Sequence, residues 1–393
     1  MLARQQLLRA VAAAISLASP ALPAAAISLA SPTLPAAADV LSPTVSTLPL
    51  SLCGGAYCVS YTVDGQSFRA VVDTGSPFVL VDGTCDANGS GQWGCYRGRG
   101  GPSGLPDTDE LFGGEDVGVQ WNLGRFELAN TTGLAVQKMN FGVVRSYVGK
   151  GGGGAVFLGF AKRRLPRIRP TLLEQMDVAG LRFDFLGRKM SLSRASLIPR
   201  DEDAVPILDL RPRGAPVANY AARISRLVIN GQVIKLDRPA VAVIDSGTTG
   251  VSVSDSLLES GLLPAQWREA RIELETEKGD TTVIEASVKR RRKPLPGVRP
   301  VDPSAEEFDE FPLIVSPVHV PWFEPGFGDS ECADGQPFQC NGRPVGRRQS
   351  VLEAWQLRRD GLGEAPHVLF VGLAFLWQRT ITIDIVDGRM TIV

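Results

Sequence analysis

The chain has 393 residues, more than a single hydrophobic core usually serves, so two domains of ordinary size are expected. Its hydrophobic fraction of 44% and charged fraction of 21% exclude a chain that stays disordered for lack of apolar residues. The 41 basic and 42 acidic residues leave a net charge of -1, which offers no strong field for phosphates. Nucleic acid is therefore not an expected partner.

Residues 1–38 differ in composition from the rest and resemble a targeting segment. They combine arginines with a stretch rich in alanine and leucine, and no acidic residue occurs before Asp39. We exclude them from the fold and expect the secretory pathway, with an extracellular or an acidic vacuolar or lysosome-like destination. A plastid transit peptide is the alternative, because the same composition suits one. No later segment is long and apolar enough to predict a membrane span in the mature chain.

From about residue 53 onward, short β-rich runs alternate with Gly, Asp, Asn and Pro, which predicts a mainly β fold. The first strands are expected at 57–63, 69–72 and 78–81. Helices are expected to be few and short, at 171–176, 254–259, 264–270 and 350–358.

A polar segment with two prolines divides this β-rich part into two units. We place the connection between the units at residues 199–205, so that the first unit spans 53–198 and the second spans 206–393. Residues 39–52 form a short linker ahead of the first unit. Within the second unit, a basic cluster, several prolines and an acidic cluster at 289–310 predict an exposed loop.

The six cysteines fall into three close pairs without a CxxC metal-binding knuckle. Three local disulfides are the simplest interpretation, and they require an oxidising compartment; free structural thiols are the alternative. The pairs are Cys53 with Cys58, Cys85 with Cys95, and Cys332 with Cys340.

Histidine is nearly absent, since only His319 and His367 occur. This disfavours a mechanism built on a histidine base and a metal site built on histidine ligands. Carboxylates must carry any acid–base chemistry, and we expect neither a metal nor a cofactor.

The most informative pattern is a motif that occurs once in each unit. The first copy, AVVDTGS, ends at Ser76, and the second, VAVIDSGT, ends at Thr248. In each copy a buried apolar strand delivers an aspartate on a fixed support, and a glycine permits a tight turn. The hydroxyl three residues after the aspartate can donate to its carboxylate. The residues of the two copies are Asp73, Thr74, Gly75, Ser76, Asp245, Ser246, Gly247 and Thr248.

This duplication resembles the pepsin-like aspartic endopeptidases, in which two homologous lobes each contribute one such aspartate to a deep cleft. The resemblance extends to hydrophobic segments ending in glycine at 155–159 and 368–372, which in that family cross behind the Asp loops. The Cys85 and Cys95 pair is similar to the family's small disulfide loop after the first aspartate. The resemblance implies a mainly β, bilobal fold, with two lobes of the six-stranded-barrel type and the active-site cleft between them.

The resemblance also implies that Asp73 and Asp245 hydrolyse peptide bonds through a shared water molecule, with polypeptides as substrates. Two neighbouring carboxyl groups cannot readily both ionise, so the pair holds one proton and activity is favoured at acidic pH. A monomer is expected, because one chain supplies both aspartates.

The sequence departs from the family at the hairpin flap that closes over substrate. The best match places Phe112, followed by Gly113, where the family has a tyrosine and a glycine. Leu80 stands where a tryptophan commonly partners that tyrosine. Because both members of the pair are missing, the alternative function is a catalytically weak or silent protein of the same fold that binds peptides or inhibitors.

Overall fold

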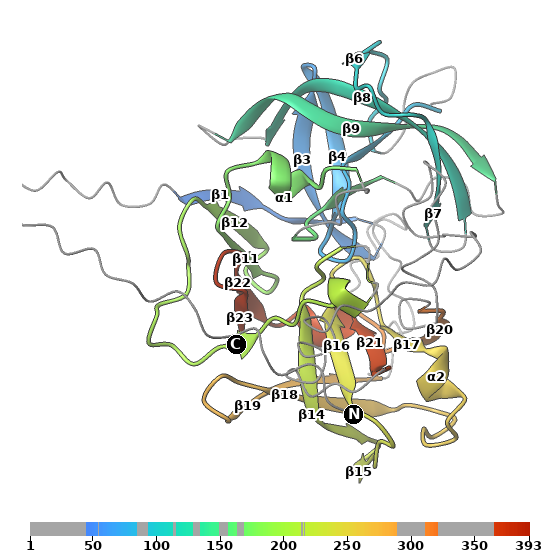
Figure 1. Ribbon diagram of the computed structural model, residues 1–393, viewed down its shortest axis with the longest axis vertical. Helices are drawn as coiled ribbons and strands as arrows, with labels where there is room; N and C mark the ends of the chain where they lie inside the picture. The colour runs from blue at the N-terminus through green and yellow to red at the C-terminus, as the bar shows by residue number, and fades with distance from the viewer. Residues whose placement is uncertain are drawn as a thin grey trace, which may run out of the picture. The chain divides into compact units, whose positions relative to one another are not determined.

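The computed structural model gives a mainly β protein, as the sequence predicts (Figure 1). Its strands belong to three sheets of nine, eight and six strands within the part of the chain that the structure describes. That part comprises residues 45–53, 55–84, 93–112, 115–128, 134–148, 156–162, 169–213, 215, 217–288, 311–320 and 365–393.

The nine-stranded sheet is drawn entirely from the first half of the chain. Its central strands β3 and β4 pair as an antiparallel hairpin, and β10 then pairs with β4 in the parallel sense. Its strands are β2 (Ser51–Cys53), β3 (Ala56–Val63), β4 (Gln66–Asp73), β5 (Leu80–Asp82), β6 (Gly101–Pro102), β7 (Thr108–Phe112), β8 (Glu115–Leu128), β9 (Ala135–Val148) and β10 (Phe157–Gly159).

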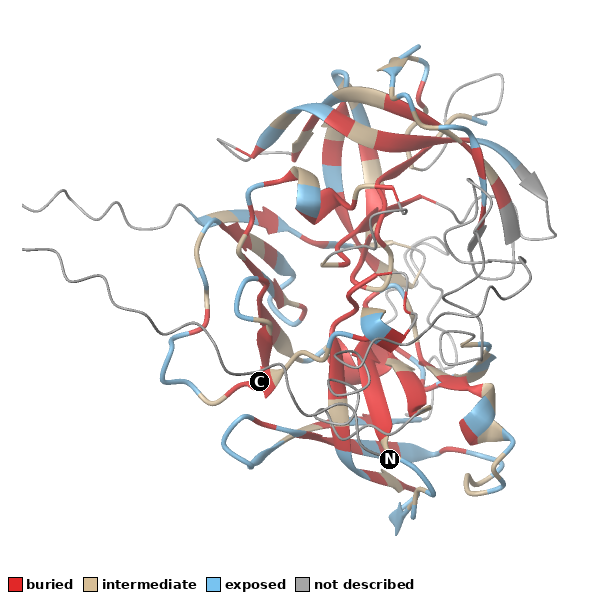
Figure 2. Ribbon diagram, in the orientation of Figure 1, coloured by how far each residue is buried: buried red, intermediate tan, exposed pale blue. Residues whose placement is uncertain are grey.

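The eight-stranded sheet comes from the second half and repeats this local arrangement. Strand β14 pairs antiparallel with β16, and β21 pairs parallel with β16. Every residue of β16 is buried, which Figure 2 shows along its length. The strands are β14 (Ala221–Ile229), β15 (Gln232–Val233), β16 (Ala240–Ile244), β17 (Val251–Ser254), β18 (Glu269–Glu275), β19 (Thr281–Ser287), β20 (Val315–Val318) and β21 (His367–Val371).

The six-stranded sheet joins strands from both halves. Two hairpins, β11–β12 and β22–β23, meet along an antiparallel pairing in which Gly180 lies opposite Asp384 and Asp184 lies opposite Thr380. Strand β1 pairs along β12, so part of the segment expected as a linker lies in this sheet. The strands are β1 (Val45–Pro49), β11 (Gly180–Asp184), β12 (Lys189–Ser193), β13 (Val205–Pro206), β22 (Thr380–Asp384) and β23 (Arg389–Ile392).

Two of the four expected helices are confirmed. Helix α1 (Leu172–Gln175) starts from a capping box, in which the Thr171 hydroxyl accepts from the Glu174 N–H and the Glu174 carboxylate accepts from the Thr171 N–H. Helix α2 (Asp255–Leu258) lies within the second expected range. Two further short helices are η1 (Arg211–Arg213) and α4 (Leu373–Leu376).

The helix expected at 264–270 is wrong. Glu269 and Ala270 open β18, and the residues before them form no helix. In β18 the buried Ala270, Ile272 and Leu274 alternate with more exposed side chains, and the strand pairs with neighbours on both sides. Sheet pairing with period-two burial therefore outweighs the local helical pattern. The helix expected at 350–358 lies outside the described residues.

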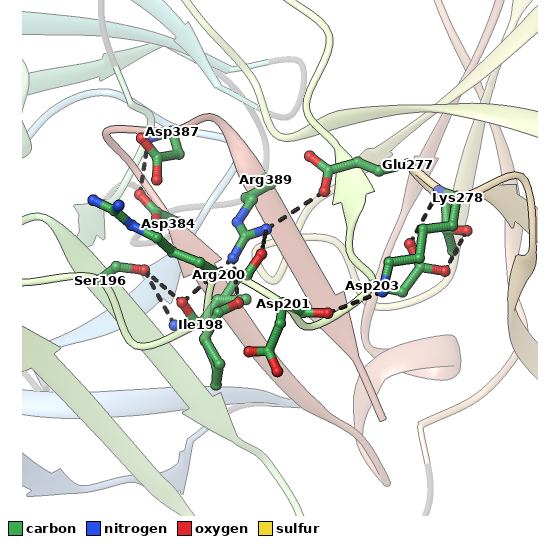
Figure 3. Close-up of polar contacts among 12 residues, drawn as sticks. Ser196, Ile198, Arg200, Asp201, Asp203, Glu277, Lys278, Asp384, Asp387 and Arg389 are labelled. Atoms are coloured by element: carbon green, nitrogen blue, oxygen red, sulfur yellow. Dashed lines mark hydrogen bonds and ion pairs between the residues drawn. The ribbon is translucent and has the colours of Figure 1, made fainter.

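The segment expected to connect the two halves is held by a buried arginine from β23 (Figure 3). The Arg389 guanidinium donates to the carbonyls of Ile198 and Pro199 through one nitrogen and to that of Arg200 through the other. It also lies 3.4 Å from the Glu277 carboxylate. Arg389 is only 7% exposed and Ile198 is buried, whereas Pro199 and Arg200 are exposed.

The turn between β18 and β19 holds the rest of the connection. The Thr276 hydroxyl donates to Asp203 over 2.7 Å, and the Lys278 N–H donates to the same carboxylate over 3.1 Å. The Lys278 ammonium donates to the Asp201 carbonyl over 2.9 Å. The connection is therefore ordered by contacts with the second half of the chain.

Replacing Arg389 by methionine should destabilise the fold by about 1–3 kcal/mol, since it keeps the apolar stem but leaves the buried Ile198 carbonyl without this donor. Urea unfolding measures this change. The control Arg200→Met removes an exposed arginine from the same cluster and should cost less than about 0.5 kcal/mol. Equal stability of Arg389→Met and wild type would show that the hydrogen bonds of the Arg389 guanidinium do not stabilise the fold.

Candidate active site

Equivalent strands place the two predicted aspartates. Asp73 is the last residue of β4, and Asp245 directly follows β16. The apolar residues before them are buried except Val71, which is half-buried. Each carboxylate is thus carried at the end of a strand fixed by packing on both sides.

The glycine-ending segments lie directly beside the Asp strands. In the parallel pairing of β10 with β4, Gly159 lies opposite Asp73, and the Phe160 N–H donates to the Asp73 carbonyl over 2.7 Å. In the second half β21 pairs with β16, and the Asp245 N–H donates to the Val371 carbonyl over 3.0 Å. The chain after each glycine also bonds to the Asp loop, as Leu373 N–H does to the Thr248 carbonyl over 2.8 Å.

The residues after the aspartates lock the two loops together by crossed hydrogen bonds. The Thr74 hydroxyl accepts from the Ser246 N–H over 2.9 Å and donates to the Ile244 carbonyl over 2.8 Å. Symmetrically, the Ser246 hydroxyl accepts from the Thr74 N–H over 3.1 Å and donates to the Val72 carbonyl over 2.7 Å. Thr74 and Ser246 are almost fully buried, so water cannot replace these bonds.

This lock brings the two carboxyl groups within hydrogen-bonding contact of each other. A Cβ atom on Gly75 would lie 2.6 Å from the Asp245 carboxylate carbon, and one on Gly247 would lie 2.5 Å from that of Asp73. Each glycine therefore makes room for the carboxylate of the opposite loop. Asp73 is 8% exposed and Asp245 is 9% exposed, so both groups are shielded from bulk water.

Each carboxylate is oriented by its own loop. Asp73 accepts hydrogen bonds from the Gly75 N–H over 2.8 Å and the Ser76 N–H over 3.2 Å, and the Ser76 side chain bonds to it as well. Asp245 accepts from the Gly247 N–H over 3.0 Å and from the Thr248 hydroxyl over 2.7 Å. The predicted hydroxyl donors are therefore both in place.

Burial is the first cause that raises the pKa of Asp73 above its ordinary value, and the adjacent charge of Asp245 is the second. The hydrogen bonds from Ser76 and Gly75 oppose this rise, because they stabilise the charged form. A carboxylic acid that keeps its proton beside a second carboxyl group can act as an acid while its neighbour acts as a base.

The flap candidate lies in a hairpin. Phe112 ends β7 and pairs with Glu115 at the start of β8, and Gly113 lies outside the described residues. The expected hairpin is therefore present, while its position over the two aspartates stays a prediction.

The disulfide between Cys53 and Cys58 is confirmed, with a Cα–Cα distance of 6.0 Å across the β2–β3 hairpin. Cys95 is also disulfide-bonded. Its expected partner Cys85, together with Cys332 and Cys340, lies outside the described residues.

Two polar groupings were not predicted from the sequence. In the first, Trp121 on β8 bonds to Thr108 on β7, which bonds to the buried Glu110. In the second, the His367 ring lies 2.7 Å from Asp237 at one nitrogen and 3.1 Å from the Ser256 hydroxyl at the other. No periodic or motif signal in the sequence connects these residues, because Trp121 and His367 each meet partners from other segments of the chain.

Burial lowers the pKa of His367, and the hydrogen bond with Asp237 partly opposes the decrease. His367 opens β21, the strand that runs beside β16 towards Asp245. We assign this histidine a structural part in holding that strand. Among the described residues, no group of three or more His, Cys, Asp and Glu side chains is arranged to hold a metal, and no helix is long and apolar enough to cross a membrane.

Comparison of the sequence with protein-family models and with curated proteins finds no match. The case for a function therefore depends on the residues and geometry of the site.

Replacing Thr74 by valine should destabilise the fold by about 2–3 kcal/mol, since it leaves the Ser246 N–H and the Ile244 carbonyl buried without partners. Ser246→Ala should cost a similar amount. The double variant should cost less than the two single losses together, by roughly 0.5–3 kcal/mol, because the two hydroxyls belong to one network. Urea unfolding gives all three values, with the exposed Thr47→Val as the control. Strict additivity would contradict the lock.

The raised pKa of Asp73 predicts how stability depends on pH. Above the ordinary carboxyl pKa, the folded chain binds a proton that the unfolded chain has lost, so stability falls as the pH rises towards the folded-state value. Asp73→Asn cannot titrate and should be more stable than wild type at neutral pH by at least about 1 kcal/mol.

Thermal unfolding across the acidic and neutral range tests this sign. The advantage of Asp73→Asn should disappear at the acidic end, where wild-type Asp73 is protonated in both states. Asp177→Asn, whose side chain is 84% exposed, should follow wild type throughout. A neutral-pH penalty for Asp73→Asn would show that the charged form is favoured.

Proposed function

We propose that the chain is an aspartic endopeptidase of the pepsin-like class, with the bilobal fold that its resemblance implies. The observation that carries this proposal is the contact between the Asp73 and Asp245 carboxyl groups on two locked, equivalent loops. A purely structural protein would have no use for two such Asp loops, since the carboxyl pair that they bury together lowers stability.

In the proposed reaction, the ionised carboxylate of the pair accepts a proton from a water molecule held between the two groups. The water oxygen attacks the carbonyl carbon of the peptide bond, while the protonated carboxyl group donates its proton to the carbonyl oxygen. The resulting diol collapses as a proton passes to the amide nitrogen and the C–N bond breaks. An amine and a carboxylic acid leave, and no covalent bond to the enzyme forms.

The surroundings of the pair support this division of roles. Crossed hydrogen bonds between the loops fix the separation of the carboxyl groups, so little reorganisation is needed during the reaction. Because a carboxyl pair holds one proton over a broad pH range, the reactive form persists through the acidic range. The proton is shared by the pair, and we do not assign it to either aspartate.

Polypeptides are the proposed substrates, and a single chain is the proposed working unit, since it supplies both carboxyl groups. The confirmed disulfide is compatible with an oxidising compartment, as on the secretory route that residues 1–38 suggest. The plastid stays the alternative destination.

The test is cleavage of an unfolded protein by the full chain between about pH 3 and about pH 7. Wild type should be most active at the acidic end. Asp73→Asn and Asp245→Asn should each lower kcat by roughly 10²–10⁴-fold, because each removes one acid–base group. The exposed Asp177→Asn is the matched control and should cleave like wild type.

Unchanged cleavage in Asp73→Asn would refute the shared mechanism. If folded wild type cleaves nothing, the silent alternative gains weight, and binding of a fluorescent unfolded peptide, followed by anisotropy, then tests it directly.

A further inference from the structure

The hairpin that holds the flap candidate buries a carboxyl group that has no part in the proposed reaction. Glu110 lies on β7 and is 1% exposed. It pairs across the hairpin with Val117, a member of a buried hydrophobic cluster. An acidic side chain in such a place costs free energy unless it is neutral or well bonded. The cluster consists of Phe78, Leu80, Val117, Val119, Trp121, Val144 and Phe157.

The directions of the hydrogen bonds around Glu110 follow from the chemistry of the groups. The Trp121 indole N–H can only donate, and it does so to the Thr108 hydroxyl over 2.9 Å. That hydroxyl in turn donates to the Glu110 carboxyl over 2.7 Å. The second carboxyl oxygen of Glu110 is buried and has no hydrogen-bond partner among the described residues. Glu110 thus ends a chain of bonds that holds the indole.

The indole packs directly against the loop that carries the first aspartate. The Trp121 and Phe78 rings meet edge to face with their centroids 5.0 Å apart. The Phe78 carbonyl accepts from the Gly159 N–H over 2.7 Å, and Gly159 lies opposite Asp73. One aromatic contact therefore separates Trp121 from the backbone that positions Asp73.

Trp121 also occupies the neighbourhood of Leu80, the position at which the sequence lacks an expected tryptophan. Leu80 and Trp121 belong to the same cluster, and a Cβ atom on Gly142, opposite Trp121 on β9, would collide with Leu80 and Val119. Strand β8 therefore supplies an indole that the Asp73 loop does not carry.

Burial and the neighbouring polar groups together set the pKa of Glu110. Burial raises the pKa of Glu110 to about 8, the adjacent Asp109 adds to the rise, and the Thr108 hydrogen bond and the Arg169 guanidinium oppose it. Arg169 lies over the Trp121 ring at 5.8 Å from its centroid. Under acidic conditions Glu110 is therefore neutral, and its buried oxygen without a partner costs less than a charge would.

We propose that Glu110 is a positioning residue, which holds Trp121 through Thr108 against Phe78 and thereby keeps the Asp73 loop in its reactive geometry. The inference rests on the proposed peptidase function and adds a second requirement to it. Glu110 acts through Trp121 and does not take part in the reaction. Its ionisation places a charge in the apolar cluster and changes the electrostatic surroundings of the indole.

The first experiment follows tryptophan emission of the full chain as the pH rises through the alkaline range. The chain has 6 tryptophans, so Trp121→Phe identifies the part of the signal that Trp121 contributes. Wild type should show a change in this part with a midpoint near 8, the value to which burial raises the pKa of Glu110. Glu110→Gln should lack the change, whereas Glu127→Gln, an exposed glutamate on β8, should keep it.

The second experiment measures kcat and KM at an acidic pH. Glu110→Leu and Thr108→Val should lower kcat by about tenfold with a smaller change in KM. Both variants remove support for the Asp73 loop, whose position matters for the chemical step more than for substrate binding. Glu110→Gln can still accept from Thr108 and should restore most of the loss. Thermal unfolding identifies variants that fail to fold. If Glu110→Leu or Thr108→Val does not fold, the comparison of Glu110→Gln with Glu127→Gln in the emission titration tests the positioning role instead.

The two readouts separate the two proposals. An emission change in a wild-type chain that cleaves nothing would refute the peptidase function and leave the coupling between Glu110 and Trp121 established. An active wild type without the emission change, or with unaltered kcat in Glu110→Leu and Thr108→Val, would overturn the positioning role alone.

Discussion

The site depends on four buried hydrogen bonds that cross between the Thr74 and Ser246 loops. They join backbone of each half to a hydroxyl of the other, so neither aspartate has its final position unless both halves are folded. Repulsion between two buried carboxyl groups would otherwise favour their separation. The lock opposes that repulsion, which after burial is the second cause of the raised pKa of Asp73. Site geometry and proton sharing thus have one structural cause.

The duplicated Asp motif and the glycine-ending segments could be predicted from the sequence because their signals are local. A run of apolar residues before Asp73 specifies a buried strand, and the glycine after it permits the approach of the opposite carboxylate. The mainly β fold and helix α1 follow from similarly short patterns. The helix expected at 264–270 failed because its last residues pair as a strand, which local propensity does not report.

The hydrogen-bonded group of Trp121, Thr108 and Glu110 could not be predicted, since Trp121 and Thr108 meet only through the pairing register of two strands. Thr108 lies opposite Val119 in the β7–β8 hairpin, and only this pairing brings it to the indole of Trp121. In the sequence Leu80 stands where the resemblance leads one to expect a tryptophan, yet nothing in it says that Trp121 packs in the same cluster as this leucine. The six-stranded sheet is equally hidden, because its central pairing joins β11 to β22, far apart along the chain.

The pairing of β11 with β22 determines when the six-stranded sheet can form during synthesis of the chain. Strands β22 and β23 are synthesised after the other described strands, yet β22 pairs along β11, and Arg389 on β23 bonds to the connection between the halves. The nine-stranded sheet has all its strands early, whereas the six-stranded sheet waits for the last of the described strands. A nascent chain therefore carries Asp73 without a fixed partner for most of its synthesis. Under the proposed function, such a nascent chain would hydrolyse no peptide bonds before β21 has paired with β16 beside Asp245, which would protect neighbouring nascent proteins.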